Sequence, residues 1–101
     1  MTYIESIAEE IRAEVPGSDL PDENSRLLFR IYAVLLLAKL EEVNAADVHN
    51  AWVAWMCSID PDHEALVPFE HLANDVARMD DAYVEAIRVV AQREVERSLE
   101  R

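Results

Sequence analysis

One unbroken apolar run sets the strongest constraint on the fold of this chain. Residues 31–38 read Ile-Tyr-Ala-Val-Leu-Leu-Leu-Ala, with Arg30 before the run and Lys39 after it. A helix built on this run is apolar on every face, and such a helix is stable in water only when other elements cover most of it. The run is too short for a membrane span, which needs roughly 20 apolar residues. We therefore expect Ser25 to Val43 to form the central helix of a small bundle.

The segments on either side carry the signals of further helices. A first helix is indicated by apolar residues at helical spacing, namely Ile4, Ile7, Ala8, Ile11 and Val15. Asn44 and Asp47 have the spacing of a capping box that opens a third helix. Pro68 suits the first position of a fourth helix, and Asp80-Asp81 precede a fifth. The prediction is an all-α bundle of about five helices, with Ala65-Leu66-Val67 left open as a short extended segment.

The length of 101 residues leaves room for one domain and one core. Within it we expect an N-terminal helical pair over residues 1–43 and a second region over residues 44–91. Over residues 92–101 only Val95 and Leu99 are large apolar residues, and the rest are mostly charged. That end is expected to be a solvated helical tail, with packing on a second copy, a homodimer, as the alternative.

The charge is strongly acidic, with 21 acidic against 9 basic residues and a formal net charge of −12. Nucleic-acid affinity comes largely from Lys and Arg that displace condensed counterions, so this composition argues against direct nucleic-acid binding. The acidity either keeps a small protein soluble or forms a face that meets a basic partner or imitates nucleic acid. The single Cys57 excludes an internal disulfide, and neither a signal peptide nor a membrane segment is apparent, so a cytoplasmic location is expected.

Several common activities are excluded by composition. Gly17 is the only glycine, so neither a Walker-type phosphate loop nor a dinucleotide-binding turn can be written onto the chain. The three histidines, His49, His63 and His71, match no zinc pattern, and Val67 stands where a zinc-protease motif beginning at His63 needs its second histidine. We therefore predict no catalytic residue, no metal and no cofactor.

One constellation remains as a candidate ligand site. It consists of His49, Trp52, Trp55, Met56, His63, Phe69 and Tyr83. Aromatic faces stack and ring nitrogens orient, so such side chains on adjoining turns can wall a pocket for a flat, partly polar ligand. The alternative is that the aromatic residues are plain core and the histidines bond to turn backbone. Spacing alone favours this second interpretation.

The linear pattern resembles the RyR domain, named for the repeats of ryanodine receptors. The resemblance covers roughly Ala45 to Val90. It rests on Val48-His49-Asn50-Ala51-Trp52, His63, Leu66-Val67-Pro68-Phe69-Glu70-His71-Leu72, Asp80-Asp81 and Ala86-Ile87. It implies a small, mainly helical module without a known catalytic role, whose prokaryotic members look like sensors in nucleotide signalling or phage conflict. Carried over by position, the signature residues are His49, Trp52, His63, Pro68, Phe69 and Glu70.

Two functional hypotheses follow. The first is a non-enzymatic module that binds a small nucleotide-derived ligand through the candidate residues, with Glu70 added by the resemblance. The second is an acidic interaction protein, such as a phage or bacterial accessory factor that blocks a basic protein partner or a nucleic-acid site.

Overall fold

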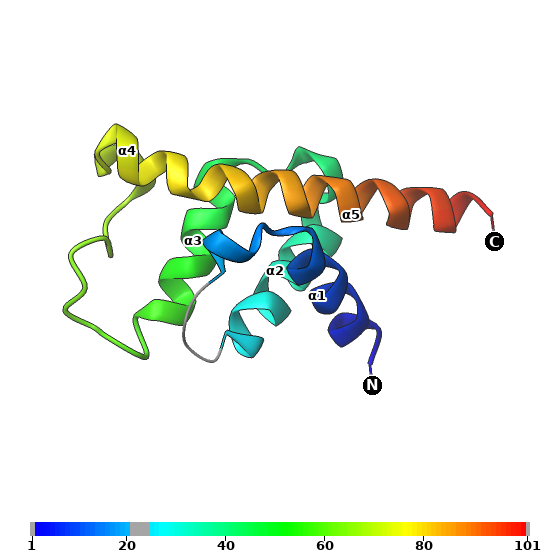
Figure 1. Cartoon of the computed structure of the whole chain (residues 1–101), viewed down its shortest axis with the longest axis horizontal. Helices are drawn as coiled ribbons and strands as arrows, with labels where there is room; N and C mark the ends of the chain where they lie inside the picture. Colours follow the sequence, from blue (N-terminus) through cyan, green and yellow to red (C-terminus); the bar gives the residue numbers. More distant parts are fainter. Residues whose placement is uncertain (1, 21–24, 101) are drawn as a thin grey trace.

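The computed structural model describes residues 2–20 and 25–100, and this part of the chain forms helices and turns without a strand (Figure 1). Four long helices carry the fold: α1 (Tyr3–Glu14), α2 (Arg26–Lys39), α3 (Ala45–Met56) and α5 (Asp81–Leu99). Between them lie the single turn α4 (Asn74–Ala77) and the 3₁₀ turns η1 (Gly17–Asp19), η2 (Leu40–Glu42), η3 (Phe69–His71) and η4 (Arg78–Asp80). The predicted all-α fold is confirmed.

Helix α2 is the centre of the bundle. It packs against α1, α3 and α5, and α5 runs along the other helices as the longest element (Figure 1). The side chains that α2 buries are Leu28, Phe29, Tyr32, Ala33 and Leu36. They meet Ile11, Val48 and Ile87 from the three neighbouring helices, none of which has exposed surface. Burial of this apolar surface is the main stabilising contribution to the fold.

The apolar run of α2 is not covered on all sides. Leu27, Val34 and Leu37 remain 53%, 56% and 38% exposed. The helix also ends at Lys39, earlier than the expected Val43. Leu40 adopts a positive φ of 53°, which breaks the helical path and leads into η2. Val43 is nevertheless fully buried, so the turn returns the chain to the core.

The capping box that the sequence predicts is present at the N-terminus of α3. Asn44 accepts a hydrogen bond from the Asp47 backbone at 2.9 Å, and the Asp47 side chain accepts one from the Asn44 backbone at 3.0 Å. This reciprocal capping box satisfies two backbone donors at the start of the helix. The third helix begins where the sequence predicts.

The fourth helix differs from the prediction. Pro68 begins only the short turn η3, whose hydrogen bonds run from His71 to Pro68 and from Leu72 to Phe69. Turns of this 3₁₀ type seldom exceed three or four residues, because their side chains eclipse and their hydrogen bonds are poorly aligned. Leu72 and Ala73 are then extended, and α4 begins only at Asn74. The predicted continuous helix from Pro68 is wrong.

The stretch left open as extended, Ala65-Leu66-Val67, forms no strand in the described chain and lies in turns and irregular backbone. The Leu66 amide donates to the His63 carbonyl at 3.2 Å, which closes a turn. This conformation leaves the Val67 carbonyl available for a side-chain donor.

The C-terminal half of α5 is tied to α1 by charge. Arg93 pairs with Glu14, and Arg97 pairs with Glu10 at 2.7 Å. The hydrogen bond from Arg97 holds the pKa of Glu10 below its ordinary value. No helix of the described residues is long and apolar enough to cross a bilayer.

Candidate functional site

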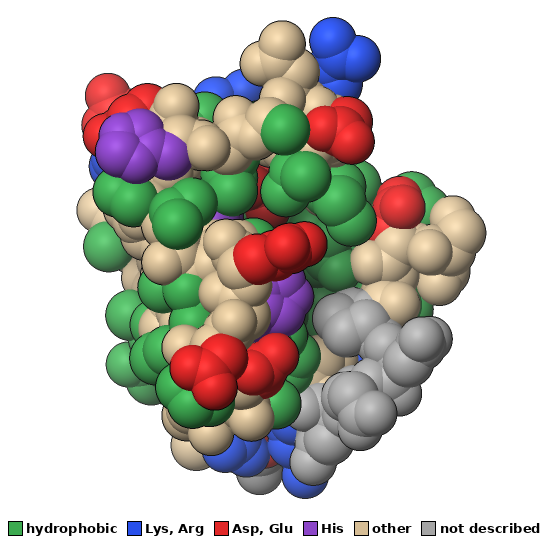
Figure 2. All heavy atoms as spheres, turned by 90° about the vertical axis from the view of Figure 1, so that its left-hand side faces the viewer, with side chains coloured by type: hydrophobic (Ala, Val, Ile, Leu, Met, Phe, Trp, Pro, Cys, Tyr) green, Lys and Arg blue, Asp and Glu red, His purple; other side chains and the backbone are tan. Residues whose placement is uncertain are grey.

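A cavity of about 440 Å³ opens beside α3 and the start of α5, and we call it the His49 cavity. Figure 2 shows the end of the molecule that carries α3 and α4, where hydrophobic and acidic side chains mix around a hollow. The cavity is lined by Ser18, Asp19, Leu20, Tyr32, His49, Trp52, His63, Ala65, Leu72, Val76, Met79, Asp80 and Tyr83. It is therefore built from five separate stretches of the chain, at residues 18–20, 32, 49–52, 63–65 and 72–83.

His49 is the best-fixed polar group of this cavity. The residue is only 3% exposed, and its Nε2 atom lies 2.6 Å from the Val67 carbonyl oxygen. A carbonyl oxygen can only accept a hydrogen bond, so Nε2 carries a proton and donates a hydrogen bond to the Val67 carbonyl oxygen. The other ring nitrogen, Nδ1, faces a carboxylate oxygen of Asp80 at 4.0 Å. Of the two ring nitrogens, only Nε2 makes a hydrogen bond within the described residues, because 4.0 Å is too long for one at Nδ1.

Asp80 is the carboxylate most affected by its surroundings. Its side chain is 15% exposed, and burial raises its pKa to about 6, with His49 opposing and Asp81 adding to the rise. Asp80 precedes α5, but its side chain makes no capping hydrogen bond there. The side chain is directed instead to the histidine on α3. A carboxylate held in this way is available to a donor in the cavity.

The aromatic wall comes from α3 and the loop after it. The Trp52 ring stacks on His49, with centroids 5.7 Å apart and an angle of 22°. His63 meets the Trp52 ring edge-on at 5.1 Å, and its Nδ1 accepts a hydrogen bond from the Ala65 amide at 3.0 Å. Trp52 is only partly buried, so a surface remains on which a ligand ring can lie.

Tyr83 joins this cavity to the turn before α2. Its hydroxyl donates to the Asp19 carbonyl at 2.5 Å, and its ring lies 5.5 Å from that of Tyr32. Burial, followed by the charges of Asp19 and Asp80, raises the pKa of Tyr83. The phenol therefore stays protonated and holds η1 against α5.

Four of the predicted site residues line the His49 cavity and four do not. His49, Trp52, His63 and Tyr83 are in its wall. Phe69 lies 6.2 Å from the His49 ring but outside the lining, and Trp55 is 4% exposed within the core. Met56 packs partly buried against that core, and Glu70 is exposed.

Sequence reasoning missed several residues that complete the wall, among them Asp19, Tyr32, Leu72, Val76, Met79 and Asp80. From the sequence, Asp80-Asp81 indicated the start of a helix and formed part of the RyR resemblance, but Asp80 was not among the predicted site residues. The available signal was the pair Asp80-Asp81, because one acidic residue is enough for a helix N-terminus and the second could have another role. Nothing local in the sequence brings Asp80 to His49.

The cavity wall holds a serine, a histidine and two aspartates, the residue types of a Ser-His-Asp triad. Ser18 lies in the wall near a histidine and an aspartate, but a catalytic triad needs the Nε2 atom of its histidine free for the serine hydroxyl. Here Val67 occupies that nitrogen. Among the described residues no three His, Cys, Asp or Glu side chains gather as metal ligands.

Comparison with known proteins corrects the family expected from the sequence. Searches of the curated proteins and of the solved structures each found no match. A family profile described as a domain of unknown function (DUF7701) matches residues 2–92, so the resemblance to RyR domains is wrong. The His49–Trp52 pair that carried it is a stack of two rings one helical turn apart, which any helix can present. The chain belongs to the family of the domain of unknown function DUF7701.

Proposed function

We propose that this protein is a non-enzymatic binding module for a small organic cation, an amine attached to a flat apolar body. The observation that carries the proposal is the Asp80 carboxylate, which lines a mostly aromatic and apolar cavity at 15% exposure. The cavity volume, about 440 Å³, falls in the range of small-molecule sites.

The charge of the lining favours a cation. Asp19 and Asp80 contribute carboxylates, and no lysine or arginine is among the described residues that line the cavity. The net charge of −12 adds a long-range field of the same sign. A phosphate-bearing ligand finds no guanidinium in this wall. The nucleotide-derived ligand came from the RyR resemblance alone, so it is not part of this proposal.

Two acceptors at one end of the cavity, His49 Nδ1 and the Asp80 carboxylate, support a binding position there for the ammonium group of the ligand. When the His49 ring carries its proton on Nε2, Nδ1 is an acceptor, and it faces the Asp80 carboxylate at 4.0 Å. An ammonium hydrogen beside Asp80 gives the carboxylate a charge-assisted partner, and such hydrogen bonds are roughly twice as strong as neutral ones. The attached ring then lies on Trp52, whose face also attracts cations.

Phenethylamine is a suitable first probe, because it has an aromatic body and one ammonium group. We expect it to quench or shift the tryptophan fluorescence saturably, and 3-phenylpropionate, its anionic counterpart, to bind at least tenfold more weakly. Asp80→Asn should remove most of this difference, since the variant keeps the shape and loses the charge. Asp81→Asn is the matched control, because Asp81 is exposed and outside the lining.

Equal binding of amine and carboxylate, or no saturable change with either, would contradict the cation proposal. Loss of amine binding in both Asp81→Asn and Asp80→Asn would mean that the overall negative charge of the protein attracts the amine, and not a carboxylate in the cavity. Circular dichroism of each variant establishes that the fold is retained before binding is compared.

A second candidate function rests on α2. Leu27 and Val34 lie seven positions apart on one face, are each more than half exposed, and have the partly buried Ile31 between them. An apolar row on an acidic protein suits a basic partner protein with an apolar contact. The test is capture of such a partner by wild type, with loss in Val34→Glu and weakening as salt rises. A homodimer and the cytoplasmic location also stay predictions.

A further inference from the structure

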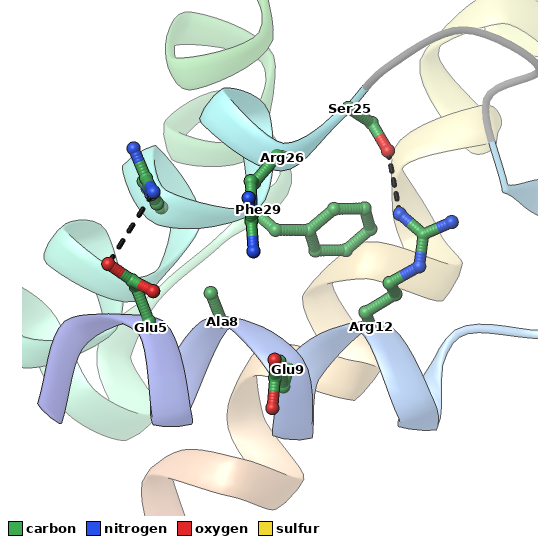
Figure 3. A pocket seen from close by; sticks show the side chains of 8 residues that line it. Glu5, Ala8, Glu9, Arg12, Ser25, Arg26 and Phe29 are labelled. Atoms are coloured by element: carbon green, nitrogen blue, oxygen red, sulfur yellow. Dashed lines mark hydrogen bonds and ion pairs between the residues drawn. The ribbon is translucent and has the colours of Figure 1, made fainter. Parts of the chain in front are cut away.

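A second hollow, of about 380 Å³, lies between α1 and the start of α2 (Figure 3). We call it the arginine groove, because Arg12, Arg26 and Arg30 all line it. These are three of only eight arginines in a chain whose net charge is −12. Among the described residues that line the groove, these three cations outnumber the two carboxylates, Glu5 and Glu9. Its charge is the reverse of that in the His49 cavity.

We propose that the arginine groove binds a small oxyanion, a phosphate or carboxylate group of a low-molecular-weight ligand. Guanidinium groups match such anions because their planar forks donate two parallel hydrogen bonds. The site is separate from the cation site proposed above and does not depend on it. The three arginines offer different kinds of support.

Arg12 is already held in place. Its guanidinium carbon lies 5.5 Å from the centre of the Phe29 ring, and one of its Nη atoms donates to the Ser25 hydroxyl at 2.9 Å. Figure 3 shows Arg12 at one end of the groove, on the side of Ser25. Stacking on a ring and a hydrogen bond fix the side chain without neutralising its charge. The fixed cation therefore costs little further ordering when an anion arrives.

Arg30 has an unsatisfied donor in the described chain. Its only ion pair in the described chain is with Glu5, at 3.5 Å, and its Nε atom is buried without a hydrogen-bond partner there. Buried N–H groups without partners are rare and call for an explanation such as a bound ion. An oxyanion that draws the guanidinium away from Glu5 can accept from Nε and Nη together. The long pair with Glu5 leaves Arg30 free to make that exchange.

The third contribution comes from the start of α2. Arg26 is the first residue of this 14-residue helix, and Figure 3 shows its side chain over the groove, on the side of Ala8. The N-terminus of a helix carries a partial positive charge, and it adds to the field of the arginines. The Ser25 side chain makes no capping hydrogen bond to the helix backbone. The positive end of α2 is thus part of the same wall as the arginines.

The probes are inorganic phosphate and succinate, each titrated by two-dimensional NMR at ionic strength matched with sodium chloride. We expect saturable shifts of amide signals over residues 5–12 and 25–30. Saturation with phosphate alone assigns a phosphoryl ligand, and saturation with succinate alone assigns a carboxylate ligand. Linear shifts with both anions, spread over the whole protein, would overturn the proposal.

Two variants with opposite expectations sharpen the test. Arg30→Gln should weaken binding by about tenfold, and Glu9→Gln should strengthen it, because Glu9 is an exposed carboxylate of the lining. Arg78→Gln is the matched control, since Arg78 is exposed and outside the groove. Equal affinities in Arg30→Gln, Glu9→Gln and wild type would contradict a site in the arginine groove. Glu9→Gln keeps the test decisive if Arg30→Gln fails to fold.

Discussion

The Nδ1 atom of His49 faces the carboxylate of Asp80 at 4.0 Å, although one residue belongs to α3 and the other directly precedes α5. The histidine is oriented by its hydrogen bond to Val67, so its second nitrogen cannot turn away without breaking that bond. The carboxylate is shielded from water on most sides, and its pKa rises to about 6. The contact therefore joins a buried histidine to a carboxyl group that holds its proton more tightly than an exposed aspartate does.

Asp80 should make the folded protein less stable as the pH rises. Burial raises the pKa of this carboxyl to about 6 from an ordinary value of 3.8. Between these values the unfolded chain has released a proton that the folded chain still holds, so the free energy of unfolding falls as pH rises and the loss is complete above the folded pKa. Asp80→Asn removes this loss. We expect the variant to gain about 1 kcal/mol over wild type near neutral pH, or roughly 4–8 °C in Tm.

The measurement compares thermal unfolding of Asp80→Asn and wild type at about pH 4 and about pH 7.5. The difference between the two proteins is used, because every ionisable group other than residue 80 is common to both. Asp81→Asn, with its exposed side chain, should show a smaller change with pH. A constant difference across this range would show that the Asp80 carboxyl titrates alike in the folded and unfolded states.

Tyr83→Phe should loosen η1 from α5. The variant deletes the hydroxyl that donates to the Asp19 carbonyl at 2.5 Å and leaves the buried ring in place. Loss of one such hydrogen bond costs roughly 0.5–1.5 kcal/mol. Urea unfolding followed by circular dichroism measures this cost, and Tyr3→Phe is the control because Tyr3 is 71% exposed. Equal midpoints for the two variants would mean that the Asp19 contact contributes nothing in solution.

Local signals in the sequence were enough for most of the helices. The capping pair Asn44 and Asp47 lies three residues apart, so its geometry follows from the backbone of a single turn. Pro68 indicated the start of a helix, but the fixed φ of proline suits a short turn equally well. Leu72 and Ala73 are extended, and Leu72 lines the cavity, a placement that no local pattern predicts.

The candidate site was predictable only where its residues share a helix or a turn. His49 and Trp52 are one turn apart on α3, so their contact follows from helical spacing. Asp80 reaches His49 through the packing of α5 on α3, and Tyr32 joins the wall from the central helix α2. Trp55 points into that core from the same helix, which periodicity could not distinguish from a ligand-facing position.

The orientation of α2 predicts unequal costs for two chemically identical substitutions. Leu36 is fully buried and Leu27 is 53% exposed. Leu36→Ala should cost about 2–5 kcal/mol, because it leaves a cavity in the core, and Leu27→Ala should stay within about 0.5 kcal/mol. Chemical denaturation at two protein concentrations measures both values. A large, concentration-dependent cost for Leu27→Ala would contradict a free α2 face and indicate that a second copy covers it.

At position 40, glycine should give a more stable protein than alanine does. Its φ of 53° and ψ of −127° lie in a region that favours glycine, because the Cβ atom of other residues clashes there, at a cost of about 1–3 kcal/mol. Leu40→Gly relieves this strain, and the lost side chain is already 39% exposed. Glycine also makes the unfolded chain more flexible, which offsets roughly 0.5–1 kcal/mol of the gain. Leu40→Ala is the matched control, because it removes the same side chain and keeps Cβ. We expect Leu40→Gly to unfold at a higher urea concentration than Leu40→Ala, with a free energy of unfolding greater by about 1 kcal/mol. The reverse order would show that residue 40 does not hold a positive φ in solution.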